Sequence, residues 1–167
     1  MVLGAIAIPQ AFVSIDAARA TGAARFVSSR LMLARSLAVQ RNASIAIRFE
    51  TDDRGVRFAA YQDGNHNGVR SRDIDLNIDW QVERPLRLFE LFPGVDFGLT
   101  VDGRDQDPIQ LGGTSLLTFT PNGTATSGSL YLRGRNGSQF AVRILGATGR
   151  TRVQHYDPRQ RQWTDEW

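Results

Sequence analysis

Two arginines near the C-terminal end of the chain have the spacing of an anion-binding site. Arg150 and Arg152 stand two residues apart in the run Gly149-Arg150-Thr151-Arg152, and residues two apart on a β-strand point to the same face. A guanidinium donates paired hydrogen bonds to phosphate, so two of them on one face can hold neighbouring phosphates. The alternative is a solvated edge strand whose arginines pair with acids such as Asp157.

The residues that follow this motif can widen the basic surface. The additional basic candidates are His155, Arg159 and Arg161. Tyr156 or Trp163 can supply a ring on which a nucleic-acid base stacks. For the polar tail that ends at Trp167, two alternatives remain open: a tryptophan docks on the sheet, or the tail forms a partner-binding end.

A dense run of turn-forming residues, at positions 63–68, opens like a calcium-binding loop. Asp63, Asn65 and Asn67 place oxygen atoms at loop positions one, three and five, and a glycine falls at the sharp bend. The twelfth position is Ile74, where such a loop needs a bidentate acid, so Asp73 or its neighbour Asp75 would have to substitute. A plain Asn/Asp/Gly turn explains the same residues. We expect no metal and no cofactor, with calcium at this loop as the alternative.

The sequence offers little for catalysis. It has two histidines, no cysteine, no Gly-x-Ser-x-Gly elbow and no phosphate-binding glycine loop. Asp73, Asp75 and Asp79 alternate in a stretch that we predict to be a strand, where they would face solvent, and no spacing singles out a glycosidase-like carboxylate pair. We therefore predict that the protein is not an enzyme; a soluble β-rich enzyme is the remote alternative.

The first of the elements that must position these motifs is a long helix. From residue 10 to residue 41 apolar residues recur at helical spacing. They are Phe12, Ile15, Ala23, Phe26, Val27, Ala34, Leu37 and Ala38. A helix of this length extends about 45 Å, more than the width of a small domain, so one end should protrude. We expect a β-rich head to pack against the second half of this helix.

After Asn42 the pattern changes to strands and turns. Alternating runs predict strands at residues 43–50, 56–62, 73–79, 95–101, 116–120, 129–133, 139–145 and 149–156. Residues 80–91 contain Pro85, so any strand there is short, interrupted or at an edge, and residues 102–108 look like a loop. The predicted fold class is α+β: a long N-terminal α-helix (residues 1–42) packed on the antiparallel β-sheets of a head (residues 43–167).

Charge is unevenly distributed along the chain. Residues 50–128 carry seven arginines against thirteen acids, whereas residues 129–167 carry seven arginines against three acids. The basic C-terminal portion suggests an acidic or polyanionic partner, although an ordinary solvated face explains the same count.

Four stretches, in this order, resemble the GspH/FimT family of H-type minor pseudopilins and FimT-like minor pilins, which belong to type II secretion pseudopili and type IV pili. They are the run Gly4–Gln10, similar to the end of a pilin membrane helix up to Pro9; the Ala-Arg-Ser signature within Leu31–Phe49; the Phe-x-Pro-x-Gly turn within Phe119–Leu132; and the Gly-Arg-x-Arg motif at Gly149–Arg152. The basic leader, the cleavage site before a Phe and the early glutamate of pilin-like proteins are not in this sequence, so we expect that the membrane anchor is missing from this chain.

The resemblance implies a pilin-like fold in which residues 10 to about 25 form an exposed stem and residues 26–38 lie under the head. The same resemblance implies a structural subunit that binds other minor and major pilins or pseudopilins. It also implies that Ile6, Ile8, Pro9, Phe12 and Ile15 pack against helices of other subunits, and that the full-length form is anchored in the inner membrane with its head in the periplasm. The alternative that it implies is a DNA-binding minor pilin, acting in DNA uptake through Arg150 and Arg152.

Overall fold

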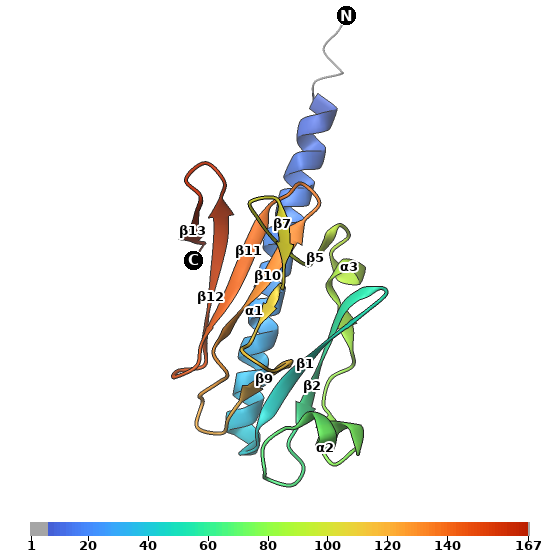
Figure 1. Ribbon diagram of the computed structural model, residues 1–167, viewed down its shortest axis with the longest axis vertical. Coiled ribbons are helices and arrows are strands. Elements are labelled where there is room, and N and C mark those ends of the chain that lie inside the picture. The colour runs from blue at the N-terminus through green and yellow to red at the C-terminus, as the bar shows by residue number, and fades with distance from the viewer. Residues whose placement is uncertain (1–6, 167) are drawn as a thin grey trace, which may run out of the picture.

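The computed structural model describes the backbone of residues 7–166 and the side chains of residues 15–166. Its first element is the helix α1 (Ala7–Arg41), which lies along the β-rich head and projects beyond it (Figure 1). The buried residues of α1 form one stripe at helical spacing: Ala20, Ala23, Ala24, Val27, Leu31, Ala34 and Ala38. The head therefore covers the helix from Ala20 onward, and the prediction of an exposed stem to residue 25 is wrong by more than a turn.

The first sheet is built on two strands that the alternating sequence predicts, at residues 43–50 and 56–62. Strand β1 (Ile45–Asp52) pairs antiparallel with β2 (Gly55–Gln62) and, on its other side, with β9 (Leu116–Phe119). The two-residue strands β3 (Trp80–Gln81) and β4 (Leu86–Arg87) pair with the free edge of β2, so the prediction of short, interrupted edge strands around Pro85 is confirmed.

The second sheet carries the C-terminal motifs. Its main strands run in the order β13 (Gln162–Asp165), β12 (Arg150–Asp157), β11 (Gln139–Leu145), β10 (Gly128–Gly134) and β5 (Val95–Phe97). The short β8 (Ile109–Gln110) pairs with β10. The polar tail that the sequence left undecided thus forms β13, an edge strand paired with β12.

A small third sheet comes from a stretch that was predicted as one strand and a loop. The chain leaves the second sheet at Gly98, and residues beyond it form the hairpin of β6 (Leu99–Val101) and β7 (Arg104–Gln106). The turn residues Asp102 and Gly103 both have positive φ, at 50° and 73°, as the two-residue hairpin turns of Asp-Gly sequences require. The predictions of one strand over residues 95–101 and of a loop over residues 102–108 are therefore wrong.

The predicted strand at residues 73–79 is also wrong. Its first residues belong to the short helix α2 (Ser71–Asp75), and Asp73 and Asp79 are buried at 8% and 1% exposure instead of facing solvent. The carboxylate of Asp79 accepts hydrogen bonds from the backbone N–H groups of Gly64 and Arg70, at 2.9 and 3.0 Å. The backbone N–H groups of the neighbouring turn need hydrogen-bond acceptors, and this need determines the local structure. The alternation of polar and apolar residues in the sequence does not reveal it.

The core lies between α1 and the inner faces of the two larger sheets. Phe49 and Phe58 of the first sheet both meet Phe97 of the second at ring-centroid distances of 5.7 and 5.8 Å. One further short helix, α3 (Leu88–Leu91), buries Leu88. The predicted class, a long helix on antiparallel sheets, is confirmed.

Candidate partner-binding surfaces

Arg150 and Arg152 lie at the start of β12, and both side chains are exposed on the same face, as predicted. Thr151 between them points the other way, where its Oγ1 lies 2.8 Å from the Oγ of Ser28 on α1. The motif thus has two outward arginines and one inward residue that links the strand to the helix. The outward face belongs to the side of the second sheet opposite α1.

A third arginine, Arg143, joins this face. Arg143 of β11 pairs directly with Arg152 in the antiparallel register, so both side chains emerge on the same face. The Nε of Arg143 donates to Gln154 Oε1 at 2.5 Å and its Nη1 donates to Ser129 Oγ at 3.1 Å. Both partners are neutral, so Arg143 keeps its full charge beside Arg152. We call Arg143, Arg150 and Arg152 the arginine face.

One acid partly balances the arginine face. Arg152 lies 3.5 Å from Asp165 of β13, with both side chains about half exposed, whereas Asp157 accepts from the backbone N–H groups of its own turn. The alternative of pairing with Asp157 is therefore replaced by a weak pair with Asp165. Beside these residues is a shallow hollow of about 430 Å³ whose lining includes Ser129 and the half-exposed Leu145.

Sequence inspection missed Arg143, although the signal was present. Strands at residues 139–145 and 149–156 were predicted, but the register between them was not assigned. That register alone places Arg143 opposite Arg152.

The glycine of the Gly-Arg-x-Arg motif has a structural reason. Gly149 has a φ of 61°, and a Cβ there would lie 2.5 Å from the carbonyl oxygen of Gly123 and 2.9 Å from the side chain of Arg35. The Nε of Arg35 donates to that same Gly123 carbonyl at 3.2 Å. The Ala-Arg-Ser, Phe-x-Pro-x-Gly and Gly-Arg-x-Arg stretches therefore meet at one point of the fold.

Arg159 and Arg161 do not widen the arginine face. They lie in the turn between β12 and β13, at the opposite end of β12 from Arg150. Seven residues separate Arg152 from Arg159, which corresponds to about 23 Å along an extended strand. The prediction of one continuous basic patch is wrong because β12 separates the arginines at its start from those in the turn after its end.

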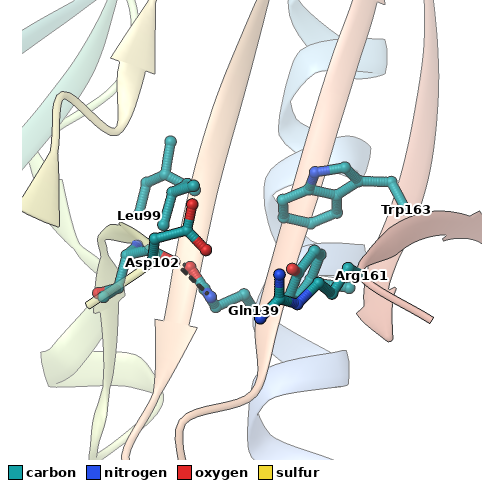
Figure 2. A pocket seen from close by; sticks show the side chains of 8 residues that line it. Leu99, Asp102, Gln139, Arg161 and Trp163 are labelled. Atoms are coloured by element: carbon teal, nitrogen blue, oxygen red, sulfur yellow. Dashed lines mark hydrogen bonds between the residues drawn. The ribbon is translucent and has the colours of Figure 1, made fainter. Parts of the chain in front are cut away.

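Arg161 instead lines a hollow of about 290 Å³ next to Trp163 and Asp102 (Figure 2). Trp163 docks on the second sheet, with its ring 5.5 Å from that of Tyr131 and 5.2 Å from that of Tyr156, measured between centroids. The docking alternative is thus correct for Trp163, while Trp167 lies outside the described residues.

The candidate calcium loop is closed by its own side chains. The two carboxylate oxygens of Asp63 accept from the backbone N–H groups of Asn65 and Gly68, at 3.2 and 2.8 Å, and Asn67 Nδ2 donates to Asp73 at 3.3 Å. These contacts are those of an Asx-type turn. Among residues 15–166 no three histidine or acidic side chains are grouped so that they can hold a metal ion.

Most of the residues that were predicted to contact other subunits have side chains outside the described part of the structure. Ile6 lies outside the described residues, as do the side chains of Ile8, Pro9 and Phe12, while Ile15 is 46% exposed. On the side of α1 away from the sheets the structure adds three further exposed apolar residues: Met32, Leu33 and Val39. In the described part of the chain no helix is both long and apolar enough to cross a membrane.

Hydrogen bonds and burial shift the pKa values of several carboxyl groups of the head, among them Asp52 and Asp96. A bidentate hydrogen bond from Arg87 lowers the pKa of Asp52 to about 2, helped by the backbone N–H of Arg54. Burial raises the pKa of Asp96, against a hydrogen bond from the backbone N–H of Phe97. The first pair fastens β4 to the β1–β2 turn, and neither group lies in the arginine face.

A long helix packed on two antiparallel sheets, with the C-terminal strands covering its middle, is the arrangement of pilin-like proteins. The family profile described as "Type II transport protein GspH" matches residues 23–149, most of the chain, and the chain belongs to this family. Its fold is similar to that of the minor pseudopilin EpsH from the type 2 secretion system of Vibrio cholerae, with a TM-score of 0.52 at 18% identity, covering 81% of this chain and 95% of that one. No curated protein sequence matches.

Proposed function

We propose that this chain is a structural subunit of a type II secretion pseudopilus or a type IV pilus tip, and that it binds other pseudopilins or pilins through α1. Membership in the GspH family supports a minor pseudopilin in type II secretion. The observation that carries the contact surface is the apolar exposure of Ile15, Met32 and Val39, at 46%, 55% and 50%, on a helix that projects beyond the head (Figure 1). Isolated exposed apolar residues are ordinary, but several along one projecting helix favour helix–helix burial.

Assembly through α1 also accounts for the architecture. Between residues 15 and 38 of α1 the buried stripe begins at Ala20, which leaves the turn around Ile15 for contact with neighbouring subunits. In this proposal the head lies in the periplasm, where the subunit is incorporated into a pseudopilus or pilus based at the inner membrane. Burial of helix surface, and not a catalysed reaction, then drives incorporation.

Because the chain has no cysteine, single-cysteine variants test this proposal cleanly. Met32→Cys and Val39→Cys should form disulfide cross-links with a sibling pseudopilin that carries one cysteine in its own helix. Arg159→Cys, in the distant β12–β13 turn, serves as the matched control and should not cross-link. Assembly of the filament without any cross-link from α1 would count against the proposal.

The second candidate is a DNA-binding minor pilin that acts in DNA uptake. The arginine face supports it, because Arg143 and Arg152 are directly opposed and, among the described side chains, Asp165 is the one acid that pairs with either of them. Like charges opposite each other destabilise a sheet, whereas three guanidiniums on one face match neighbouring phosphates of a nucleic acid backbone.

A salt-dependence measurement separates this candidate from the first. Changing all three arginines of the face to glutamine should weaken binding of double-stranded DNA strongly and reduce the slope of log K against log salt by about three. Arg159→Gln with Arg161→Gln removes charge at the far end of β12 and should leave most of the slope. If wild-type protein binds no DNA at low salt, or if both variants lose binding equally, the arginine face is not a DNA site. Cross-linking through α1 should survive either set of changes.

A further inference from the structure

The hollow between the β6–β7 and β12–β13 hairpins has several features of a small-ligand site. Its volume, about 290 Å³, is close to the lower end of the range for small-molecule pockets. The side chains of interest are Leu99, Asp102, Gln139, Tyr156, Arg161 and Trp163. None of the six belongs to the arginine face or to the exposed side of α1, although the guanidinium of Arg143 lies 5.9 Å from the ring centroid of Trp163 and joins the hollow to the edge of the arginine face.

One wall is an aromatic ring held in a fixed orientation. Trp163 packs against Tyr131 and Tyr156, at centroid distances of 5.5 and 5.2 Å, and remains partly exposed beside the hollow. An indole with this support presents an apolar face without losing much side-chain freedom when a ligand stacks on it.

The base of the hollow is fixed by Gln139, which is only 9% exposed. Its Oε1 accepts from the backbone N–H of Thr100 at 2.8 Å, and its Nε2 donates to the carbonyl of Thr100 at 2.9 Å. The amide thereby fastens β6 to the start of β11. The hollow exists before any ligand enters, because both of its edges are tied to the second sheet.

Two opposite charges line the hollow without partners. Among the described residues neither Asp102 nor Arg161 makes a hydrogen bond or an ion pair through its side chain. Figure 2 shows Asp102 on one side of the hollow, Trp163 and Arg161 on the other side, and Gln139 between the two sides. The site as a whole is therefore electrically balanced, yet it offers guanidinium donors and carboxylate acceptors.

The backbone at Arg161 points to a function for its side chain. Arg161 has a φ of 52°, a conformation for which glycine or asparagine is the usual choice. The similar φ of Asp102 is explained by its Asp-Gly hairpin turn, but nothing in the β12–β13 turn requires an arginine. Strain of this kind is retained where a particular side chain is needed.

We propose that this hollow binds a neutral saccharide, with one sugar ring stacked on Trp163. Sugar hydroxyls both donate and accept, so they match Arg161 and Asp102 together, whereas an anion would be repelled by Asp102 and a cation by Arg161. The apolar C–H face of the ring matches the indole. Asp102 and Arg161 are binding residues in this proposal, and Gln139 is a positioning residue.

The indole N–H signal of Trp163 in a proton–nitrogen NMR spectrum gives a direct readout, and Trp163→Phe assigns it among the three tryptophans. The probes are glucose, galactose, N-acetylglucosamine and the β-1,4-linked disaccharides of glucose and of N-acetylglucosamine. At least one should shift this signal saturably, with a Kd of millimolar order as expected for a ligand of this size. Acetate and glycine are the anionic and zwitterionic comparison probes.

Arg161→Gly removes the guanidinium and relieves the unfavourable φ, so the variant should melt at a higher temperature than the wild type while binding the sugar at least tenfold more weakly. Asp102→Asn should also weaken binding, and Arg159→Ala, in the same turn, should not. The proposal is overturned if no sugar gives a saturable shift, if acetate or glycine shifts the signal and sugars do not, or if Arg161→Gly keeps full affinity.

Discussion

The Nε of Arg35 on α1 donates a hydrogen bond to the carbonyl oxygen of Gly123, 3.2 Å away in the turn after β9. Gly149, at the entry to β12, packs against both groups so closely that a Cβ would have no room. One contact therefore fixes the helix, the end of the first sheet and the start of the strand that bears Arg150 and Arg152. The three family-like motifs therefore hold the helix and the two larger sheets together. The position of the arginine face depends on these contacts.

Replacing Gly149 with alanine should destabilise the head severely. The left-handed φ alone costs about 1–2 kcal/mol for a residue with a Cβ, and the collision with the Gly123 carbonyl adds about 1–3 kcal/mol. Gly137→Ala is the matched control, because Gly137 has a φ of 81° and no atom within 4 Å of its Cβ position, so it should lose the first term alone. Urea unfolding of both variants measures the difference, and equal losses would contradict the close-packing explanation.

Thr151 should matter for stability while its two arginine neighbours should not. Thr151→Val leaves the hydroxyl of Ser28, which is 8% exposed, without its partner at 2.8 Å, and we expect a loss of about 1–2 kcal/mol. Adding Ser28→Ala should restore part of that loss, because both polar groups are then gone. Arg150→Gln, fully at the surface, should change the unfolding free energy by less than about 0.5 kcal/mol. A double variant that is simply additive would show that the two hydroxyls do not interact.

The sequence predicts the parts of this fold that depend on periodicity, and the structure departs from it where single contacts decide. Spacing in α1 and alternation in β1, β2, β10, β11 and β12 were sufficient, because each element buries one face. Asp79 was predicted on an exposed strand, yet it is buried because two backbone N–H groups need its carboxylate. Arg143 was missed because its place opposite Arg152 depends on the register between β11 and β12. Arg161 was wrongly grouped with Arg152 because the length of β12 separates the two. Tertiary distances of this kind are absent from a one-dimensional pattern.

The half-buried carboxyl of Asp96 should make the protein slightly less stable at neutral pH than an amide would. Burial raises the pKa of Asp96, so the folded state disfavours the ionised form and gains stability as the pH falls through that pKa. Asp96→Asn keeps an oxygen to accept from the Phe97 N–H and should raise the thermal midpoint at pH 7. The gain should shrink in acid, where the wild-type side chain is also neutral. A gain that grows as the pH falls would show that burial of the charge is not its cause.

Charge placed on the exposed side of α1 should impair assembly without unfolding the head. Met32 and Val39 are 55% and 50% exposed, so Met32→Lys and Val39→Lys should change the unfolding free energy by less than about 0.5 kcal/mol. In a contact with another subunit helix, however, each lysine would have to be desolvated without a partner, which is strongly unfavourable. Binding to sibling pseudopilins should fall at least tenfold, which corresponds to about 1.4 kcal/mol. Gln160→Lys, at an exposed polar position in the β12–β13 turn, introduces the same charge away from α1 and tests whether any new lysine has this effect. Melting curves and pull-down with purified siblings give the two readouts, and undiminished binding by both apolar-site variants would remove this side of α1 from the interface.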